Sequence, residues 1–423
     1  MTEPNDTDAL CVDVAIIGGG LAGGVAALAL SASGFSTALI DAESPETLTN
    51  AAYDGRTTAL AYASGRLFQR LGLWPALEDV ASPINQILVT DGALHSPSCD
   101  GGTMDAHLRF DARDPENGLD GEMPLGWIVE NQRIRRAVAD GLAEVPDTHV
   151  LAPARRLKTV NEQGASITTL ADGRRVSAAL TIAADGKRSR LAAEAGIKDL
   201  TWGYPQDAII ATVRHERPHR GIAQEYFLPA GPFAILPMTD NRSSIVWTET
   251  RGAARRYLAL DDAAFLSALK TRFGDYLGAL SLAGPRGAYP LSFRFAQRFY
   301  GERLALIGDA AHAIHPIAGQ GYNLGVKDIA ALVDVLVKAR GLGQDIGAAD
   351  VLAQYDRWRR FDAAGLAFGT DVLNRLFSNN IPFLQAARRI GLAAVNRIGP
   401  LKTVFMRESG ADLGDLPTLL QPI

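Results

Sequence analysis

Residues 308–328 read Gly-Asp-Ala-Ala-His-Ala-Ile-His-Pro-Ile-Ala-Gly-Gln-Gly-Tyr-Asn-Leu-Gly-Val-Lys-Asp, and this stretch decides the fold. The apolar run 304–307 precedes it, and the helical pattern 328–339, rich in Ala, Val and Leu, follows it. This order predicts a strand, a ligand-binding loop and a helix. Glycines let backbone N–H groups approach a flat or anionic ligand, and the start of a helix favours negative charge there.

A second glycine pattern lies near the N-terminus. The apolar run 12–17 leads into Gly18-Gly19-Gly20-Leu21-Ala22-Gly23-Gly24, where glycines 18, 20 and 23 fit the spacing G-x-G-x-x-G. In the dinucleotide-binding fold, the first of these glycines makes a tight turn and the second leaves room for a pyrophosphate. The third lets the following helix pack closely on the sheet.

The next elements complete a nucleotide-binding unit. A helix is expected over 25–33 and a strand over 36–40, and the strand delivers Asp41, 18 residues after Gly23. An acid at this place accepts hydrogen bonds from an adenosine ribose. A Gly-rich turn alone is weak support, whereas strand, glycines, helix, strand and acid in this order predict a nucleotide. Together with the loop after residue 308, they predict a flavin dinucleotide, FAD.

The composition fits one large enzyme. The chain has 423 residues, more than one hydrophobic core usually holds, and 47% of them are hydrophobic. The net charge is −5, and no stripe of Lys and Arg is available to neutralise phosphates, which argues against a nucleic-acid-binding protein. Two cysteines, Cys11 and Cys99, predict a reducing compartment without structural disulfides. Because no signal segment and no run of about 18 apolar residues is found, we expect a cytoplasmic protein.

Changes of pattern along the chain predict the domains. The FAD-binding domain is discontinuous and takes in residues 1–80, 105–200 and 296–345. A substrate domain of strands and turns takes in 81–104 and 201–295, and 346–423 is a C-terminal helical region. The predicted fold class is therefore α/β, with a Rossmann-type FAD-binding domain, an inserted mixed β-sheet substrate domain and C-terminal helices.

Two acids follow expected buried strands. Asp185 comes after the apolar run 179–184, and Asp309 comes after 304–307. Ligands bind at the carboxyl ends of strands in open α/β sheets, so both acids are candidate ligand contacts. For Asp185 an alternative stays open, since it could simply cap the basic helix that follows.

Two further candidates come from neighbouring segments. Arg56 is the one charge on its side of the unit that could reach a cofactor, and its alternative is an ordinary surface arginine. Asn131 stands at the start of an expected helix. It could serve as an N-cap or contact a cofactor ribose.

These residues carry a resemblance to a known family. The signatures at 18–23, 185–186 and 308–309 resemble those of the single-component FAD aromatic hydroxylases of the para-hydroxybenzoate hydroxylase type. The string His-Pro-Ile-Ala-Gly-Gln-Gly-Tyr-Asn-Leu-Gly-x-x-Asp at 315–328 resembles the signature of the ubiquinone-biosynthesis hydroxylases, the UbiH/UbiF/VisC branch. Further resemblances to that branch, which extend the similarity over nearly the whole chain, lie at 54–60, 129–131 and 231–247.

The resemblance implies a monooxygenase that hydroxylates the aromatic ring of a polyprenylated phenol in ubiquinone biosynthesis. NAD(P)H would reduce FAD, and O2 would then give a flavin hydroperoxide that the phenol attacks. Two other classes stay open. One is a different FAD enzyme, namely another aromatic hydroxylase, an epoxidase or a dehydrogenase. The other is a non-catalytic FAD-binding scaffold that organises the enzymes of a quinone pathway.

The resemblance also assigns roles. Asp309 would hold the ribityl or ribose part of FAD, and Asp185 would lie near the pyrophosphate and the reductant. The flavin loop, 316–325, would wrap the pyrimidine edge of the ring, with backbone groups of Pro316, Gly319, Gln320 and Gly321 facing the chemistry. The full set of expected cofactor contacts is Gly18, Gly20, Leu21, Ala22, Gly23, Asp41, Arg56, Asn131, Asp185, Gly308, Asp309, Pro316, Gly319, Gly321, Tyr322 and Asn323.

Other assignments are negative or open. No metal is expected, because His312 and His315 lack a third ligand, and His315 is expected to orient the flavin loop. No second G-x-G-x-x-G unit offers a nicotinamide site, so NAD(P)H is expected to bind transiently near Asp185, with an external donor as the alternative. The base that activates the phenol is left open among Tyr204, Tyr226, Tyr289 and His215.

The C-terminal region mixes aromatic residues with arginines. Residues 356–407 include Trp358, Phe361 and Phe368 beside Arg359 and Arg360. A basic amphipathic helix can lie on a membrane surface, which would suit a lipid-borne phenol. The alternative is a set of helices that pack on the FAD-binding domain with solvated arginines. Peripheral contact with the inner membrane and with other quinone-biosynthesis enzymes therefore stays a hypothesis.

Overall fold

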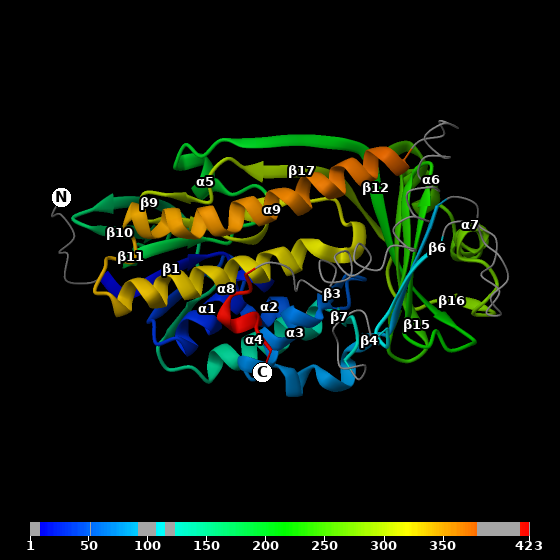
Figure 1. Ribbon diagram of the computed structural model, residues 1–423, viewed down its shortest axis with the longest axis horizontal. Coiled ribbons are helices and arrows are strands. Elements are labelled where there is room, and N and C mark those ends of the chain that lie inside the picture. Colours follow the sequence, from blue (N-terminus) through cyan, green and yellow to red (C-terminus); the bar gives the residue numbers. More distant parts are fainter. Residues whose placement is uncertain (1–8, 51, 92–106, 115–122, 379–414, 423) are drawn as a thin grey trace.

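The structure is a computed structural model that describes residues 9–50, 52–91, 107–114, 123–378 and 415–422. Two large sheets lie at opposite ends of the molecule, and the helix α9 (Ala349–Phe377) runs along it from one sheet to the other (Figure 1). The predicted α/β class, with a Rossmann-type domain and an inserted sheet, is confirmed.

The first sheet is mostly parallel and forms the nucleotide-binding half. Its strands follow the order β18-β19-β11-β1-β2-β8, and β10 and then β9 continue from β11. Strand β1 is apolar almost throughout, because a parallel strand that helices cover on both faces has no solvent side. The strands are β1 (Ala9–Ile17), β2 (Thr37–Ile40), β8 (Thr148–Leu151), β9 (Arg156–Glu162), β10 (Ala165–Leu170), β11 (Arg175–Ala183), β18 (Tyr300–Gly301) and β19 (Leu304–Leu306).

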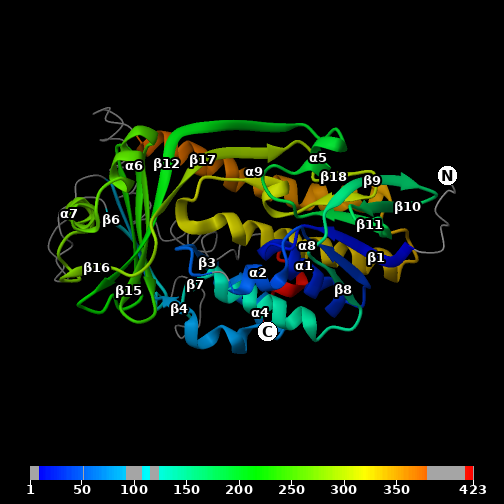
Figure 2. The same ribbon diagram turned by 180° about the vertical axis from the view of Figure 1, so that it is seen from behind.

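Helices cover this sheet, and a small sheet stands beside it (Figure 2). A Cβ on Gly24 of α1 would lie 2.5 Å from Cγ1 of Val138 on α4, so the glycine permits close helix packing. The helices are α1 (Leu21–Ala32), α2 (Pro45–Asn50), α3 (Tyr62–Arg70), α4 (Asn131–Ala143), α5 (Arg190–Glu194) and α8 (Gln320–Gly341). The small sheet contains β3 (Thr57–Ala61), β7 (Gly126–Glu130) and β4 (Ser82–Ile84).

The second sheet is mostly antiparallel and follows the order β20-β17-β12-β15-β14-β13-β5-β6, with β16 beside β12. Its strands are β5 (Gln86–Asp91), β6 (His107–Asp111), β12 (Asp199–His215), β13 (Ile222–Leu228), β14 (Gly231–Met238), β15 (Arg242–Thr250), β16 (Leu280–Leu282), β17 (Gly287–Ala296) and β20 (His312–Ala313). Helices α6 (Arg251–Leu258) and α7 (Asp262–Phe273) cover one face, where Trp247 and Phe265 share a buried core.

Two details differ from the sequence prediction. Helix α8 begins at Gln320, eight residues before the predicted start at 328. It takes in Gly321 and Gly325, and a Cβ on Gly325 would lie 3.1 Å from Cα of Gly308, so this glycine lets the helix pass close to that backbone. Strand β6, which the predicted boundary at 105 places in the FAD-binding domain, pairs with β5 in the second sheet. Within the described ranges, no helix combines the length and the apolar character needed to cross a bilayer.

Candidate active site

The first glycine turn leaves an open space at the start of α1. Gly18 has a φ of +109°, and a Cβ there would collide with the Ala184 carbonyl. A Cβ on Gly23 would collide with the Gly18 carbonyl, whereas one on Gly20 would meet nothing within 4 Å. Gly20 is also the N-cap of α1, and no side chain caps the helix. Free amides and empty space therefore meet where an anionic group can bind.

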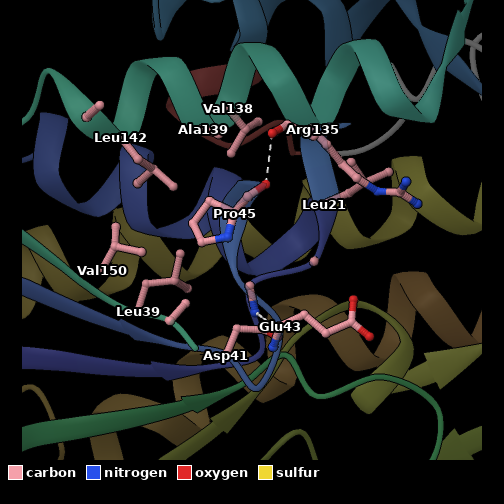
Figure 3. A pocket seen from close by; sticks show the side chains of 15 residues that line it. Leu21, Leu39, Asp41, Glu43, Pro45, Arg135, Val138, Ala139, Leu142 and Val150 are labelled. Carbon is pink, nitrogen blue, oxygen red and sulfur yellow. Dashed lines mark hydrogen bonds between the residues drawn. The ribbon is translucent and has the colours of Figure 1, made fainter. Parts of the chain in front are cut away.

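A cavity of about 240 Å³ adjoins this turn, between α4 and the ends of β2 and β8 (Figure 3). Leu39, Val138 and Leu142 give it an apolar wall, and Asp41 stands at its floor. The Asp41 carboxylate accepts hydrogen bonds from the amides of Gly19 and, at 2.8 Å, Glu43. A mainly apolar cavity with an acid at one side fits an adenosine.

The arginine of this cavity is Arg135, which the sequence analysis missed. In Figure 3 its guanidinium and the Glu43 carboxylate lie on the same side of the cavity. Burial and the nearby Arg56 lower the pKa of Arg135, although Asp54 opposes this. Arg56 itself forms a two-point ion pair with Asp54, its side chain is 45% exposed, and it does not line this cavity. The position of Arg135, one helical turn after Asn131, is the signal that could have found it.

Asn131 connects α4 to the small sheet. Its side-chain oxygen accepts a 2.7 Å hydrogen bond from the Thr58 hydroxyl, and its backbone N–H donates to the Arg56 carbonyl. The N-cap interpretation is wrong, because Glu130 is the N-cap of α4 and Asn131 is the first helical residue.

Asp185 and Asp309 follow the neighbouring parallel strands β11 and β19. One oxygen of Asp185 accepts from the amides of Arg190 at 2.9 Å and Leu191 at 3.4 Å in the first turn of α5, although the N-cap of that helix is Ser189. Its other oxygen is buried without a hydrogen-bond partner in the described chain. Asp309 is exposed to solvent yet crowded by protein, and this desolvation raises its pKa against the opposing effect of Lys187. The Asp309 side chain is therefore accessible to a ligand, and the unpartnered Asp185 oxygen lies at the same edge of the sheet.

The flavin loop enters α8 through a left-handed turn. Gly319 has a φ of +65°, and a Cβ there would lie 2.9 Å from Cβ of Ala59. The Asn323 amide accepts from the Ala61 backbone at 3.0 Å and donates to the Ala59 carbonyl at 2.9 Å. These bonds fix the first turn of α8 to β3. Gly321, Tyr322 and the neighbouring backbone then face a cavity.

A buried ionic network supports Gly308 from behind. The Asp328 carboxylate meets His312 Nε2 at 2.6 Å and Arg359 Nε at 3.0 Å, and it accepts from the Gly308 amide at 3.1 Å. Although burial opposes ionisation, His312 and Arg359 lower the pKa of Asp328. The final Asp of the signature therefore braces the strand end, and His312 is its partner.

His315 lies fully buried behind the flavin loop. Burial lowers its pKa to about 4, so the ring is neutral at pH 7. Neither ring nitrogen has a hydrogen-bond partner in the part of the chain that the structure describes. Its ring packs edge-on against Tyr204, with centroids 5.3 Å apart, and the Tyr204 hydroxyl donates to Asp371 at 2.6 Å.

A second cavity, of about 400 Å³, separates the flavin loop from the second sheet. On the loop side it is lined by Pro316, Gly319, Gln320, Gly321 and Tyr322, so the structure brings the predicted loop residues together. On the sheet side the lining is mainly apolar and includes Ile87, Ala208, Ile210, Ala234, Leu236 and Val246. The cavity can hold an apolar molecule with one face toward the loop.

Of the four candidate bases, Tyr289 alone lines this cavity. Both ring nitrogens of His215 lie within hydrogen-bonding distance of Arg217 O and Ser243 Oγ. Tyr226 lies in the core under α6 and α7, and Tyr204 contacts His315 instead. The sequence showed these side chains but not which face of the sheet each one occupies.

Together these features fit an extended dinucleotide with a flat ring: the glycine turn, the cavity that contains Asp41, the two acids at the strand ends and the cavity beside the flavin loop. A family profile described as an FAD binding domain matches residues 11–366. The ubiquinone hydroxylase UbiL of Rhodospirillum rubrum is 46% identical over 397 residues, covering 94% of this chain and 89% of that protein. The 3-demethoxyubiquinol 3-hydroxylase of Escherichia coli is 33% identical, covering 92% of this chain and 96% of that protein.

A solved structure has the same fold. The p-nitrophenol 4-monooxygenase PnpA from Pseudomonas putida matches with a TM-score of 0.74 over 95% of this chain and 98% of that one. Its sequence is 19% identical, so the likeness concerns the fold alone.

Proposed function

Since the chain belongs to the FAD-dependent monooxygenase family of ubiquinone biosynthesis, we propose that its substrate is a polyprenylated phenol, which it hydroxylates on the ring. The predictions of family, of FAD and of a hydroxylase are confirmed by these relatives. The observation that carries the substrate is the mainly apolar cavity of about 400 Å³ between the second sheet and the flavin loop. This cavity would bind a hydrophobic aromatic ring in contact with the backbone of the flavin loop.

The proposal assigns the ends of FAD to the two cavities. The space beside Gly20 takes the pyrophosphate at the start of α1, and the cavity that contains Asp41 takes the adenosine, with Arg135 as an added contact. Asp309 takes the ribityl chain, and the loop that contains Gly319 takes the flavin ring. The other predicted contacts, Leu21, Ala22, Arg56, Asn131 and Asp185, stay predictions.

The redox chemistry, electron uptake from NAD(P)H and activation of O2, belongs to FAD when bound. The protein binds and orients the two reactants and keeps water away from them. Fixed backbone amides at the start of α8 are placed to stabilise negative charge at the ring edge. The structure of the flavin loop, pinned by Asn323, supports this role because preorganised dipoles need not rearrange during the reaction.

The test is product formation by the purified holoprotein. With NADPH or NADH, labelled O2 and 2-farnesylphenol in detergent, we expect a product heavier by one labelled oxygen atom. NAD(P)H oxidation without oxygen transfer would favour a dehydrogenase. Binding of FAD without substrate-dependent oxidation of any prenylated phenol would favour the scaffold alternative.

We further propose peripheral membrane contact through the outer face of α9. Phe361 is 87% exposed and Val372 is 60% exposed on this helix, and the exposed Arg357 and Arg360 lie on it too. Apolar side chains beside arginines suit an anionic lipid surface. The inner part of α9 packs on the FAD-binding half, so the two interpretations of this region apply to opposite faces of one helix. Residues 379–414 of the predicted tail lie outside the described residues.

A further inference from the structure

One carboxylate stands on the cavity face of the second sheet. Glu225 on β13 pairs with Ala234 on β14, which pairs with Val246 on β15, which pairs with Ile210 on β12. Residues directly opposite each other in an antiparallel sheet point to the same face. All four line the cavity of about 400 Å³, so the Glu225 side chain belongs to its wall, across from the flavin loop.

The next residue on this strand faces the other way. Side chains alternate along a strand, so Tyr226 points to the opposite face. There it packs with Phe233 and Trp247 under α6 and α7. Figure 2 shows these helices on the outer side of the sheet, away from the FAD-binding half. The alternation therefore places the Glu225 side chain on the cavity face and the Tyr226 ring in the core under α6 and α7.

Other polar groups of the cavity are poorer proton acceptors. Tyr289 is 43% exposed, and a tyrosine is protonated at neutral pH. Thr248 is buried, and its hydroxyl has no partner in the described chain, so it can hold a substrate hydroxyl without taking its proton. Beside Glu225, the titratable side chains among the described lining residues are Tyr289 and Tyr322.

We propose that Glu225 is the catalytic base that accepts the proton of the substrate's phenol hydroxyl, an inference that rests on the proposed function. In this step the O–H bond breaks, the proton goes to a carboxylate oxygen of Glu225, and the electron pair stays on the phenol oxygen. Donation from that oxygen makes the ring carbon a stronger nucleophile. Because the phenol becomes more acidic as the ring attacks, a carboxylate suffices as the acceptor.

The proton balance closes within the same site. After one oxygen atom has been added, the ring loses the hydrogen of the attacked carbon to water and becomes aromatic again. Glu225 then returns its proton to the original phenol oxygen. The base is regenerated, and the oxygen, NAD(P)H and protons consumed are those of the proposed hydroxylation.

Glu225→Gln tests this role in the FAD-loaded, full-length protein. The substitution keeps the shape of the side chain and one oxygen that can accept a hydrogen bond, but it removes the proton acceptor. We expect hydroxylation of 2-farnesylphenol at pH 7 to fall by roughly 10²–10⁴-fold, the usual contribution of a general base. FAD content and substrate binding, measured by quenching of flavin fluorescence, should stay within about twofold, in keeping with a residue that acts on the proton alone.

The pH profile separates a base from a structural residue. In Glu225→Gln the rate should rise about tenfold per pH unit below the phenol's own pKa of about 10, because only the ionised substrate reacts. The wild type should rise much less. Tyr226→Phe is the matched control, since it removes a hydroxyl from the next residue on the opposite face, and it should keep the wild-type rate and profile.

The outcomes are distinct. A Glu225→Gln variant within about threefold of the wild-type rate, or one with a large loss but the wild-type pH profile, would overturn the assignment of the base. If that variant fails to fold, Glu225→Ala serves instead, because it also removes the carboxylate, and a loss of the same order with the same steeper profile is expected. A wild-type enzyme that oxygenates no prenylated phenol would overturn the proposed function, and this inference with it.

Discussion

Asp328→Asn should destabilise the protein more than any change at its surface. The side chain is fully buried, and its charge balances Arg359, which is 2% exposed. Removing one partner of a buried pair costs about 3–5 kcal/mol of unfolding free energy. We expect about 3 kcal/mol, the lower end, because Asp362 still pairs with Arg359 and an asparagine oxygen can still accept from the amide of Gly308.

The first measurement is urea unfolding of the FAD-free protein. The second, on the FAD-loaded protein, follows FAD release by flavin fluorescence. FAD should leave faster from the variant, because the network holds the strand end that carries Asp309. Asp172→Asn is the matched control, since it breaks an aspartate–arginine pair of two largely exposed side chains, and it should leave the unfolding midpoint unchanged. A loss below about 1 kcal/mol in Asp328→Asn, with unchanged FAD release, would refute the argument that this network braces the site.

Three further changes test other parts of the structure. Gly20→Val should have the melting temperature of the FAD-free wild type but purify without FAD, because its side chain fills open space beside the uncapped start of α1. FAD bound at wild-type content would contradict this. Burial lowers the pKa of His315 to about 4. Between pH 4 and 6.5 the unfolded state therefore binds one more proton than the folded state, so the free energy of unfolding decreases as the pH is lowered through that window. His315→Gln should therefore lose about 2 kcal/mol less than the wild type between pH 7 and 5 in urea unfolding, and equal losses would refute it. Phe361→Ser should weaken co-sedimentation with anionic vesicles, and raised salt should weaken it further, whereas Leu342→Ser, another exposed apolar position, should have no effect. Equal behaviour of the two variants would count against membrane contact through α9.

The order of the elements along the chain could be predicted because its signals are local. The apolar run before Gly18, the spacing of the glycines and Asp41 after the second strand predict a nucleotide-binding unit within about 30 residues. The same holds for the strand and loop around Asp309. The start of α8 was predicted too late, since Gly321 and Gly325 look like loop residues in the sequence, and the close approach of Gly325 to Gly308 is visible only in the structure.

What the sequence determined by itself is the nucleotide-binding half and its ligand, because glycine geometry and apolar periodicity act between near neighbours. Tertiary structure alone decided which distant side chains meet. Arg359 reaches Asp328 from 31 residues away, Arg135 joins Asp41 in one cavity, and Glu225 rather than Tyr226 faces the flavin loop. A strand's alternation is visible in the chain, but the choice between its two faces depends on what packs against each, and that is fixed only when the sheets and helices assemble.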